Sequence, residues 1–258
     1  TKVHRQPNEA GIPIVAEAIR NMAPLILEQF VSGKSKGIGV SIYPTFDMST
    51  LIDDVLAVYR EFDHAGEVQI LAARDETCLQ INRALHLENK AYREYSKQET
   101  HALLTNELEL CEGDKILYKN SNDFKRKLFN GSLGVITRIY DNPICKSNDY
   151  GDIEIVVAVA EFDSAGAIQI TENDLEYINL GYAIAAPNSQ WERVVIVSEF
   201  VEKVSSIVDN AWFYTAVTSC EKQAVIVGSQ VNFSYHIGMP PKAFSRIIGL
   251  SFKNTEVM

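Results

Sequence analysis

Apolar side chains recur at helical spacing in two segments near the start of the chain. The sequence DMSTLIDDVLAVYREFD, residues 47–63, predicts a helix that is capped by Ser49 or Thr50. Its apolar stripe consists of Leu51, Val55, Val58 and Tyr59. Residues 11–30 predict a second helix, whose apolar face holds Ile14, Ala18 and Ile19.

Short apolar runs next to helical patterns predict a parallel sheet. EVQILAAR, residues 67–74, is typical of a strand, and DETCLQINRALH, residues 75–86, of the helix that follows it in a βα unit. ERVVIVSEF, residues 192–200, has four consecutive apolar residues, the pattern of a strand buried on both faces. Residues 205–218 then predict a helix and residues 223–228 a last strand. The fold class is therefore α/β.

The region between these parts has a different pattern. EGDKILYKN, GSLGVITRIY, DIEIVVAVAEFD and AIQITEND are short β runs separated by Asn, Gly and Asp turns. No long helical pattern interrupts them, which predicts an antiparallel barrel or sheet of about 60–70 residues. We expect an α/β domain in two parts, residues 1–108 and 179–258, with a β module at 109–178 inserted between them.

Charge and composition restrict the classes of function. The 258 residues are 46% hydrophobic and carry a net charge of −10, so any nucleic-acid contact needs a local basic surface. No apolar run approaches the roughly 18–20 residues that span a bilayer, and the first residues do not form a signal peptide. Without an initiator Met, we expect a fragment of a longer protein. The four cysteines are far apart with no CxxC pair, which disfavours a zinc site or disulfides and favours the reducing cytoplasm.

Familiar catalytic motifs are missing from the sequence. It contains no GxxxxGK[ST] phosphate loop, no GxGxxG, no HExxH and no GxSxG. The five histidines are scattered, and none pairs with another at the spacing of metal ligands. We therefore expect no metal site and no enzyme that acts alone.

One local run of positive charge stands out from the acidic background. Residues 115–127 contain Lys115, Lys119, Lys125, Arg126 and Lys127. Asp123 is the only acid among them. Such a run is typical of a solvated hairpin edge, and it is also compatible with a nucleic-acid contact, so both interpretations stay open.

Four segments, in this order, carry a family resemblance. They are TKVHRQ with a following helix that ends in AIRN, then NGSLGVITRI, LGYAIAAPNSQWERVVIV and WFYTAVTSCEKQAVIVG. Together they resemble the C-terminal motor half of superfamily 1 DNA helicases of the RecD type, which are related to exonuclease V alpha subunits. The resemblance covers nearly the whole chain. It implies a RecA-like second motor domain that is interrupted by an SH3-like β-barrel.

The resemblance also implies an activity: 5′→3′ translocation on single-stranded DNA driven by ATP hydrolysis, in DNA repair, recombination or DNA transfer. ATP and Mg²⁺ would be held mainly by an N-terminal RecA-like domain of the same polypeptide, upstream of Thr1. Other helicase–nuclease subunits are further expected partners, and a membrane is not. In this chain, the implied nucleotide-binding residues are Arg5, Gln6, Ser189 and Gln190. Arg5 matches the family arginine that reaches the γ-phosphate.

The sequence departs from the family pattern at two places near this nucleotide site. Family members carry an arginine finger after YTAVT, and Ser219 stands at that catalytic position. Loss of such an arginine costs about 10³–10⁵ in rate. In the loop before Trp191, Ala185, Pro187 and Asn188 replace the family Thr, His and Lys, and the loop is shortened. The protein is then a degenerate motor, or the chain departs here from the native sequence.

The DNA-binding residues that the resemblance implies are Arg74, Lys125, Arg126, Lys127, Asn130 and Asn188. Asn130 begins an Asn-Gly pair, which is first of all a turn signal. Trp191, Trp212, Phe213 and Tyr214 could stack on bases, but their pattern favours a buried core. Two other functions remain open: a catalytically silent single-strand-binding module on a helicase scaffold, and a protein–protein scaffold that docks through the β module.

Overall fold

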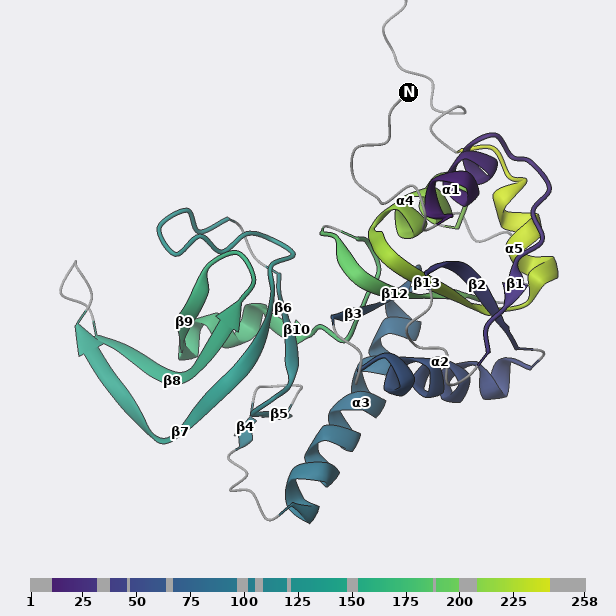
Figure 1. Ribbon diagram of the computed structural model, residues 1–258. Helices are drawn as coiled ribbons and strands as arrows, with labels where there is room; N and C mark the ends of the chain where they lie inside the picture. Colours follow the sequence, from purple (N-terminus) through teal and green to yellow (C-terminus); the bar gives the residue numbers. More distant parts are fainter. Residues whose placement is uncertain are drawn as a thin grey trace, which may run out of the picture.

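A parallel sheet flanked by helices on both faces forms one part of the molecule, and an antiparallel sheet forms the other (Figure 1). The computed structural model describes residues 11–31, 38–45, 47–63, 67–96, 102–104, 109–119, 122–147, 153–187, 189–199 and 208–241. In this part of the chain, no helix combines the length and the apolar character needed to cross a membrane.

The parallel sheet has six strands in the order β1-β2-β13-β12-β3-β11. They are β1 (Glu28–Gln29), β2 (Gly39–Pro44), β3 (Val68–Ala72), β11 (Ala183–Ile184), β12 (Trp191–Ser198) and β13 (Cys220–Gly228). Neighbouring strands in this sheet pair in parallel throughout the described residues. The central strands are apolar and buried along most of their length, as the continuous hydrophobic runs predicted. The α/β class is confirmed.

Two layers of helices cover this sheet. They are α2 (Met48–Asp63) and α3 (Asp75–Tyr95) on one face, and α1 (Ile12–Arg20), α4 (Asn210–Thr218) and α5 (Gln230–Ile237) on the other. Figure 1 shows α1, from the start of the chain, beside α4, which in turn packs against α5 at the end of the chain. Each layer buries its own apolar cluster against the sheet.

The helix predictions were correct for residues 47–63 and 75–86, whereas the helix predicted over residues 11–30 ends at Arg20 and is followed by strand β1. The predicted stripe of α2 is buried. Its cap is Asp47, whose Oδ1 accepts from the Ser49 amide at 2.9 Å, and not Ser49 or Thr50. The predicted apolar face of α1 was correct for Ile19 and wrong for Ile14, because the helix buries Ile12, Ala16 and Ile19 while Ile14 is exposed.

The antiparallel sheet lies between α3 and β11 in the chain and has the order β10-β6-β7-β8-β9. It consists of β6 (Lys115–Tyr118), β7 (Leu133–Ser147), β8 (Ile153–Phe162), β9 (Gly166–Thr171) and β10 (Ile178–Leu180). A separate hairpin of β4 (Ala102–Leu104) and β5 (Glu109–Cys111) precedes it. Along the chain, this antiparallel sheet therefore separates α3 and β3 from β11, β12 and β13 of the parallel sheet. The domain bounds given by the sequence stay a prediction.

The predicted closure into an SH3-like barrel is not seen. Among the described residues no pairing joins β9 to β10, the two edge strands, so the sheet stays open. The chain passes from β9 to β10 through the 3₁₀ helix η2 (Glu172–Tyr177). The pairing of the long strands β7 and β8 also shifts register at two places, where irregular pairing increases twist and bending.

Candidate functional site

The predicted nucleotide residues that are described lie at the amino-terminal end of β12 and β13. Ser189 is exposed, Gln190 is half-buried, and both directly precede β12. The Trp191 amide donates to the Ser219 carbonyl at 3.0 Å, which joins this loop to the junction between α4 and β13. The fold thus brings Ser189, Gln190 and Ser219 to one edge of the sheet, although they are far apart in the sequence.

Ser219 ends α4 with its hydroxyl directed at its own helix. The residue is buried, and its Oγ donates to the Ala216 carbonyl at 2.7 Å. Its amide donates to the Thr215 carbonyl at 3.1 Å. These bonds satisfy carbonyl groups that the end of a helix leaves without partners. The Ser219 side chain therefore has a structural task here, and it supplies no charge to a phosphate.

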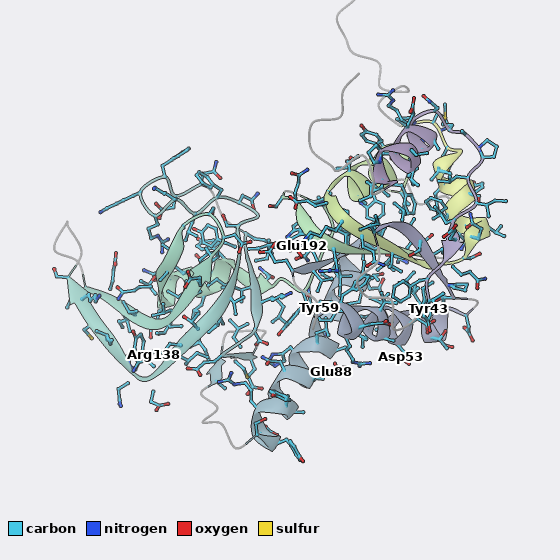
Figure 2. The ribbon with its side chains drawn as sticks, in the orientation of Figure 1. Tyr43, Asp53, Tyr59, Glu88, Arg138 and Glu192 are labelled. Carbon is cyan, nitrogen blue, oxygen red and sulfur yellow. The ribbon has the colours of Figure 1, made fainter. Side chains whose placement is uncertain are left out.

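The described residues at this edge do not by themselves form a triphosphate site. Two cations on these strands, Lys222 and Arg193, are both ion-paired with Glu192. Figure 2 places Glu192 at the side of the parallel sheet toward the inserted sheet. These pairings lower the pKa of Glu192. Arg5, Gln6 and Asn188, the other predicted contacts, lie outside the described residues. Their predicted roles are neither supported nor contradicted.

Arg74 lies at the opposite edge of the parallel sheet, which is formed by the carboxyl-terminal ends of the strands. At this point the chain leaves the neighbouring strands β3 and β12 toward different faces of the sheet. After β3 the chain continues into α3, and after β12 it leads to α4 on the other face. Ligands of open α/β sheets bind in such crevices. The Arg74 guanidinium lies 3.1 Å from Glu76 and 3.5 Å from the buried carboxylate of Glu199.

Glu199 makes this edge less favourable for an anion than the sequence suggested. Burial raises the pKa of its carboxyl group, and Thr77 and Arg74 oppose that rise. A phosphate that approached Arg74 would therefore compete with two carboxylates for one guanidinium.

The other predicted DNA contacts cluster on the loop that joins β6 to β7, drawn in teal in Figure 1. Lys125, Lys127 and Asn130 are exposed there. The Asn-Gly pair forms the predicted turn: the Ser132 amide donates to the Phe129 carbonyl at 2.9 Å, and Gly131 has a φ of 93°.

Arg126 differs from its neighbours because its guanidinium is already bound. Its Nε donates to Asp123 at 2.6 Å, and its two Nη atoms donate to Asp174 of η2 at 2.8 Å each. This bidentate pair raises the pKa of Arg126 above its ordinary value. Lys115, at the start of the same basic run, donates to the Val68 carbonyl at 3.1 Å and lies over the ring of Tyr59, labelled in Figure 2.

The four aromatic residues proposed as alternative stacking platforms belong to the core. Trp191 and Phe213 are buried, and Trp212 and Tyr214 pack against the same apolar cluster. The Trp212 indole donates to the Ala185 carbonyl at 3.1 Å. Their core interpretation is confirmed.

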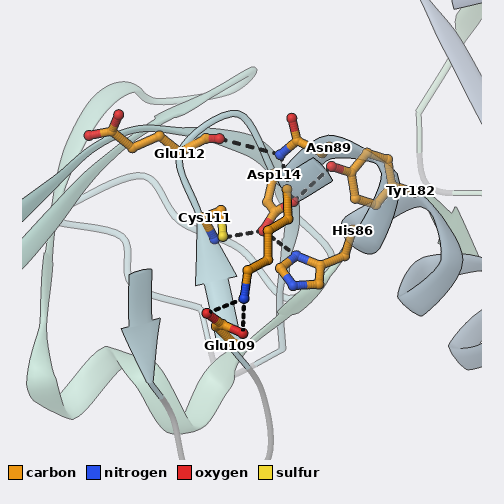
Figure 3. A network of polar contacts seen from close by, with 8 residues as sticks. His86, Asn89, Glu109, Cys111, Glu112, Asp114 and Tyr182 are labelled. Atoms are coloured by element: carbon orange, nitrogen blue, oxygen red, sulfur yellow. Dashed lines mark hydrogen bonds and ion pairs between the residues drawn. The ribbon is translucent and has the colours of Figure 1, made fainter. Parts of the chain in front are cut away.

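A buried polar network that the sequence did not reveal joins α3 to the inserted sheet (Figure 3). The fully buried carboxylate of Asp114 accepts from the Cys111 amide at 2.7 Å, Asn89 at 3.0 Å and the Tyr182 hydroxyl at 2.9 Å, and it pairs with His86 Nδ1 at 2.8 Å. Asp114 and Tyr182 flank the two crossings between the α/β part and the sheet. The network therefore fixes how the two parts are joined.

The same network contains a cluster that resembles a metal site, because ligand atoms of His86, Cys111 and Asp114 lie within 4.8 Å of one another. Both carboxylate oxygens of Asp114 already have two partners, which uses their capacity as acceptors. Burial and the nearby acids raise the pKa of the Cys111 thiol to about 11, so it is not a thiolate at neutral pH. The cluster is a structural junction.

A cleft of about 910 Å³ lies between α3, η2, β10 and β11. Charged side chains of both signs line it: Asp75, Arg83, Lys119, Glu172 and Glu176. With three acids against two cations, its lining does not favour a polyanion.

No protein-family model and no curated protein matches this chain. Among solved structures, the chain is similar to Pif1 helicase from Bacteroides in complex with ADP-AlF3 and ssDNA, with 15% identity and a TM-score of 0.48, over 95% of this chain and 54% of that one. Bacteroides Pif1 bound to ssDNA gives 16% identity and a TM-score of 0.46, with coverage of 95% and 54%. The chain thus spans about half the length of these proteins. Likeness at this level establishes no family, and no residue's role is transferred from it.

Proposed function

We propose that this chain is the second motor half of an ATP-dependent, RecD-like superfamily 1 DNA helicase, which translocates on single-stranded DNA in repair, recombination or DNA transfer. The observation that carries the proposal is the architecture. A six-stranded parallel sheet with helices on both faces is interrupted, between α3 and β11, by an antiparallel sheet. The motif order in the sequence implies this interrupted arrangement.

In this proposal the chain acts together with an N-terminal RecA-like domain that holds most of the ATP and Mg²⁺ contacts. Residues 1–108 and 179–258 form the second motor domain, and residues 109–178 form the inserted module, which we still propose to be related to SH3-like domains despite its open sheet. Arg5, Gln6, Ser189 and Gln190 face the nucleotide, and Ser219 occupies the position of the arginine finger. Other helicase–nuclease subunits are proposed partners, and the cytoplasm is the proposed location.

For DNA, the proposal assigns the contacts to Arg74, Asn188 and the loop between β6 and β7. The exposed cations of that loop, Lys125 and Lys127, are the local basic surface that an acidic protein needs. Binding through such contacts is electrostatic, so affinity should fall as salt concentration rises.

The alternative is a catalytically silent single-strand-binding module, and one observation favours it. Ser219 is buried and bonded to its own helix, so this position contributes no cation. An arginine from elsewhere would have to replace it in a working motor.

Two measurements test the proposal and separate it from the alternative. The 258-residue chain should bind labelled oligothymidylate in a salt-dependent way and should not hydrolyse ATP by itself. Turnover by the purified chain, free of contaminating ATPase, would refute the assignment as half of a two-domain motor. Absence of single-strand binding at low salt would refute both the motor and the binding module, and would leave the protein–protein scaffold.

A further inference from the structure

The loop between β6 and β7 ends in a small, well-defined tip. Asp123 and Leu128 form an antiparallel bridge: the Asp123 amide donates to the Leu128 carbonyl at 2.7 Å, and the Leu128 amide donates to the Asp123 carbonyl at 3.0 Å. The bridge encloses residues 124–127. Leu128 is fully buried beneath it and anchors the loop to the core of the inserted sheet.

Arg126 connects this tip to the rest of the sheet. It bonds Asp123 within the loop and Asp174 on η2, and Asp174 also accepts from the Thr171 amide at 2.9 Å and the Thr171 hydroxyl at 2.8 Å. A bidentate arginine–carboxylate pair fixes geometry as well as contributing energy. The tip is therefore pre-organised, because Arg126 is bound to both Asp123 and Asp174.

On this tip the ring of Phe124 projects into solvent. The ring is 77% exposed. It therefore does not gain most of the roughly 1.5–3 kcal/mol by which burial of a Phe side chain stabilises a fold. The ring of Phe129, 39% exposed, supports it from one side, with centroids 5.9 Å apart and an interplanar angle of 76°. The ring of Phe124 stays largely open to solvent in this edge-to-face pair, and the exposed Lys125 and Lys127 follow it in the chain.

An exposed ring that is followed along the chain by the exposed cations Lys125 and Lys127 matches the chemistry of a single nucleic-acid strand. Unpaired bases offer flat apolar faces, and the phosphates on either side of each base carry negative charge. We propose that Phe124 is a stacking platform for an unpaired base of single-stranded DNA, with Lys125 and Lys127 contacting the flanking phosphates and Arg126 positioning the tip. This inference rests on the proposed function, which supplies the single-stranded DNA.

The test compares two labelled probes by fluorescence anisotropy at fixed salt. One is oligothymidylate of about 20 nucleotides, longer than the roughly 4–16 nucleotides that one small β module covers. The other is an abasic strand of the same length, which keeps the phosphates and lacks the bases. For Phe124→Ala, affinity for oligothymidylate should fall by about 5- to 150-fold, since stacking on an aromatic side chain contributes about 1–3 kcal/mol per base. Affinity for the abasic strand should not change.

Control variants separate stacking from other effects. Tyr95→Ala removes an aromatic ring that is 88% exposed at the end of α3, far from the tip in the chain, and should leave both affinities unchanged. Phe124→Leu keeps an apolar side chain without the aromatic face and should lose most of the oligothymidylate affinity. Phe124→Trp should keep it, and its exposed indole should be quenched when DNA binds.

The outcomes distinguish this inference from the proposed function. If the unmodified chain binds oligothymidylate and Phe124→Ala binds it equally well, stacking is refuted while the proposed function stands. If Phe124→Ala loses affinity for both probes to the same extent, the ring acts through the fold or the backbone, and stacking is again refuted. If the unmodified chain binds neither probe, the proposed function fails first, and this inference fails with it.

Discussion

The substitution Asp114→Ala should destabilise the protein more than most single changes. The carboxylate is fully buried and serves four donors: the Cys111 amide, Asn89 Nδ2, the Tyr182 hydroxyl and His86 Nδ1. Its removal leaves the Cys111 amide, the Tyr182 hydroxyl and His86 Nδ1 without this acceptor, at about 1–3 kcal/mol for each unsatisfied group, while Asn89 Nδ2 keeps its bond to the Glu112 carbonyl at 3.3 Å. These effects are not additive. We therefore expect the loss of Asp114 from its buried pair with His86 to lower the free energy of unfolding by about 3–5 kcal/mol in total.

Urea unfolding followed by circular dichroism measures this change as a shift in midpoint at constant slope. Glu109→Gln is the matched control, since it breaks the pair with Lys90, in which both side chains are about one-third exposed. Water screens that pair, so the midpoint should move much less than for Asp114→Ala. An Asp114→Ala variant that unfolds at the same urea concentration as the unmodified chain would show that the network does not hold the two parts together.

The same network predicts a dependence of stability on pH. The hydrogen bond to Asp114 raises the pKa of His86 above its ordinary value, against the effect of burial. A group whose pKa is higher in the folded state stabilises the fold fully below its unfolded pKa, about 6.5 for histidine. This contribution should be lost as pH rises through the raised pKa. The difference in unfolding midpoint between the unmodified chain and His86→Gln should therefore shrink over that range, and a difference that grows would contradict the assignment.

Three further predictions concern other parts of the molecule. In Gly228→Ala, the added Cβ would lie 2.3 Å from the Ser198 carbonyl oxygen, and residue 228 would keep a φ of 149°. The free energy of unfolding should therefore fall by at least about 1–3 kcal/mol, which would be measured as a lower melting temperature. An unchanged melting temperature would contradict this geometry. The Ser219 hydroxyl donates to the Ala216 carbonyl, so Ser219→Ala should lower the free energy of unfolding by about 0.5–1.5 kcal/mol and leave the affinity for single-stranded DNA unchanged. A loss of that affinity would show that Ser219 takes part in DNA binding. Lys127→Ala should reduce the slope of log affinity against log salt by about 1, and an unchanged slope would remove its phosphate contact.

Much of the fold could be predicted because periodicity reports burial directly. The continuous apolar run in residues 194–197 marked a strand buried on both faces, and the stripe of α2 marked the face that packs on the sheet. Barrel closure could not be predicted, since it depends on whether the edge strands β9 and β10 meet. Here η2 joins them instead.

The candidate site was less predictable for a different reason. The sequence identified the basic run at 115–127, but it could not show that Arg126 is bound to Asp174, 48 residues away, or that Ser219 is bonded to Ala216. The network around Asp114 escaped notice because its members are scattered and match no motif. The acid at position 114, placed between a turn and a strand in a β module, was its only local signal.

The measurement that tests the central claim most directly is ATP hydrolysis by the native protein that contains this chain together with its first motor domain, with and without single-stranded DNA. Our account predicts turnover that rises when single-stranded DNA is added, and an arginine supplied from a position other than Ser219. Single-strand binding without any turnover would contradict the motor assignment and establish the silent binding module in its place.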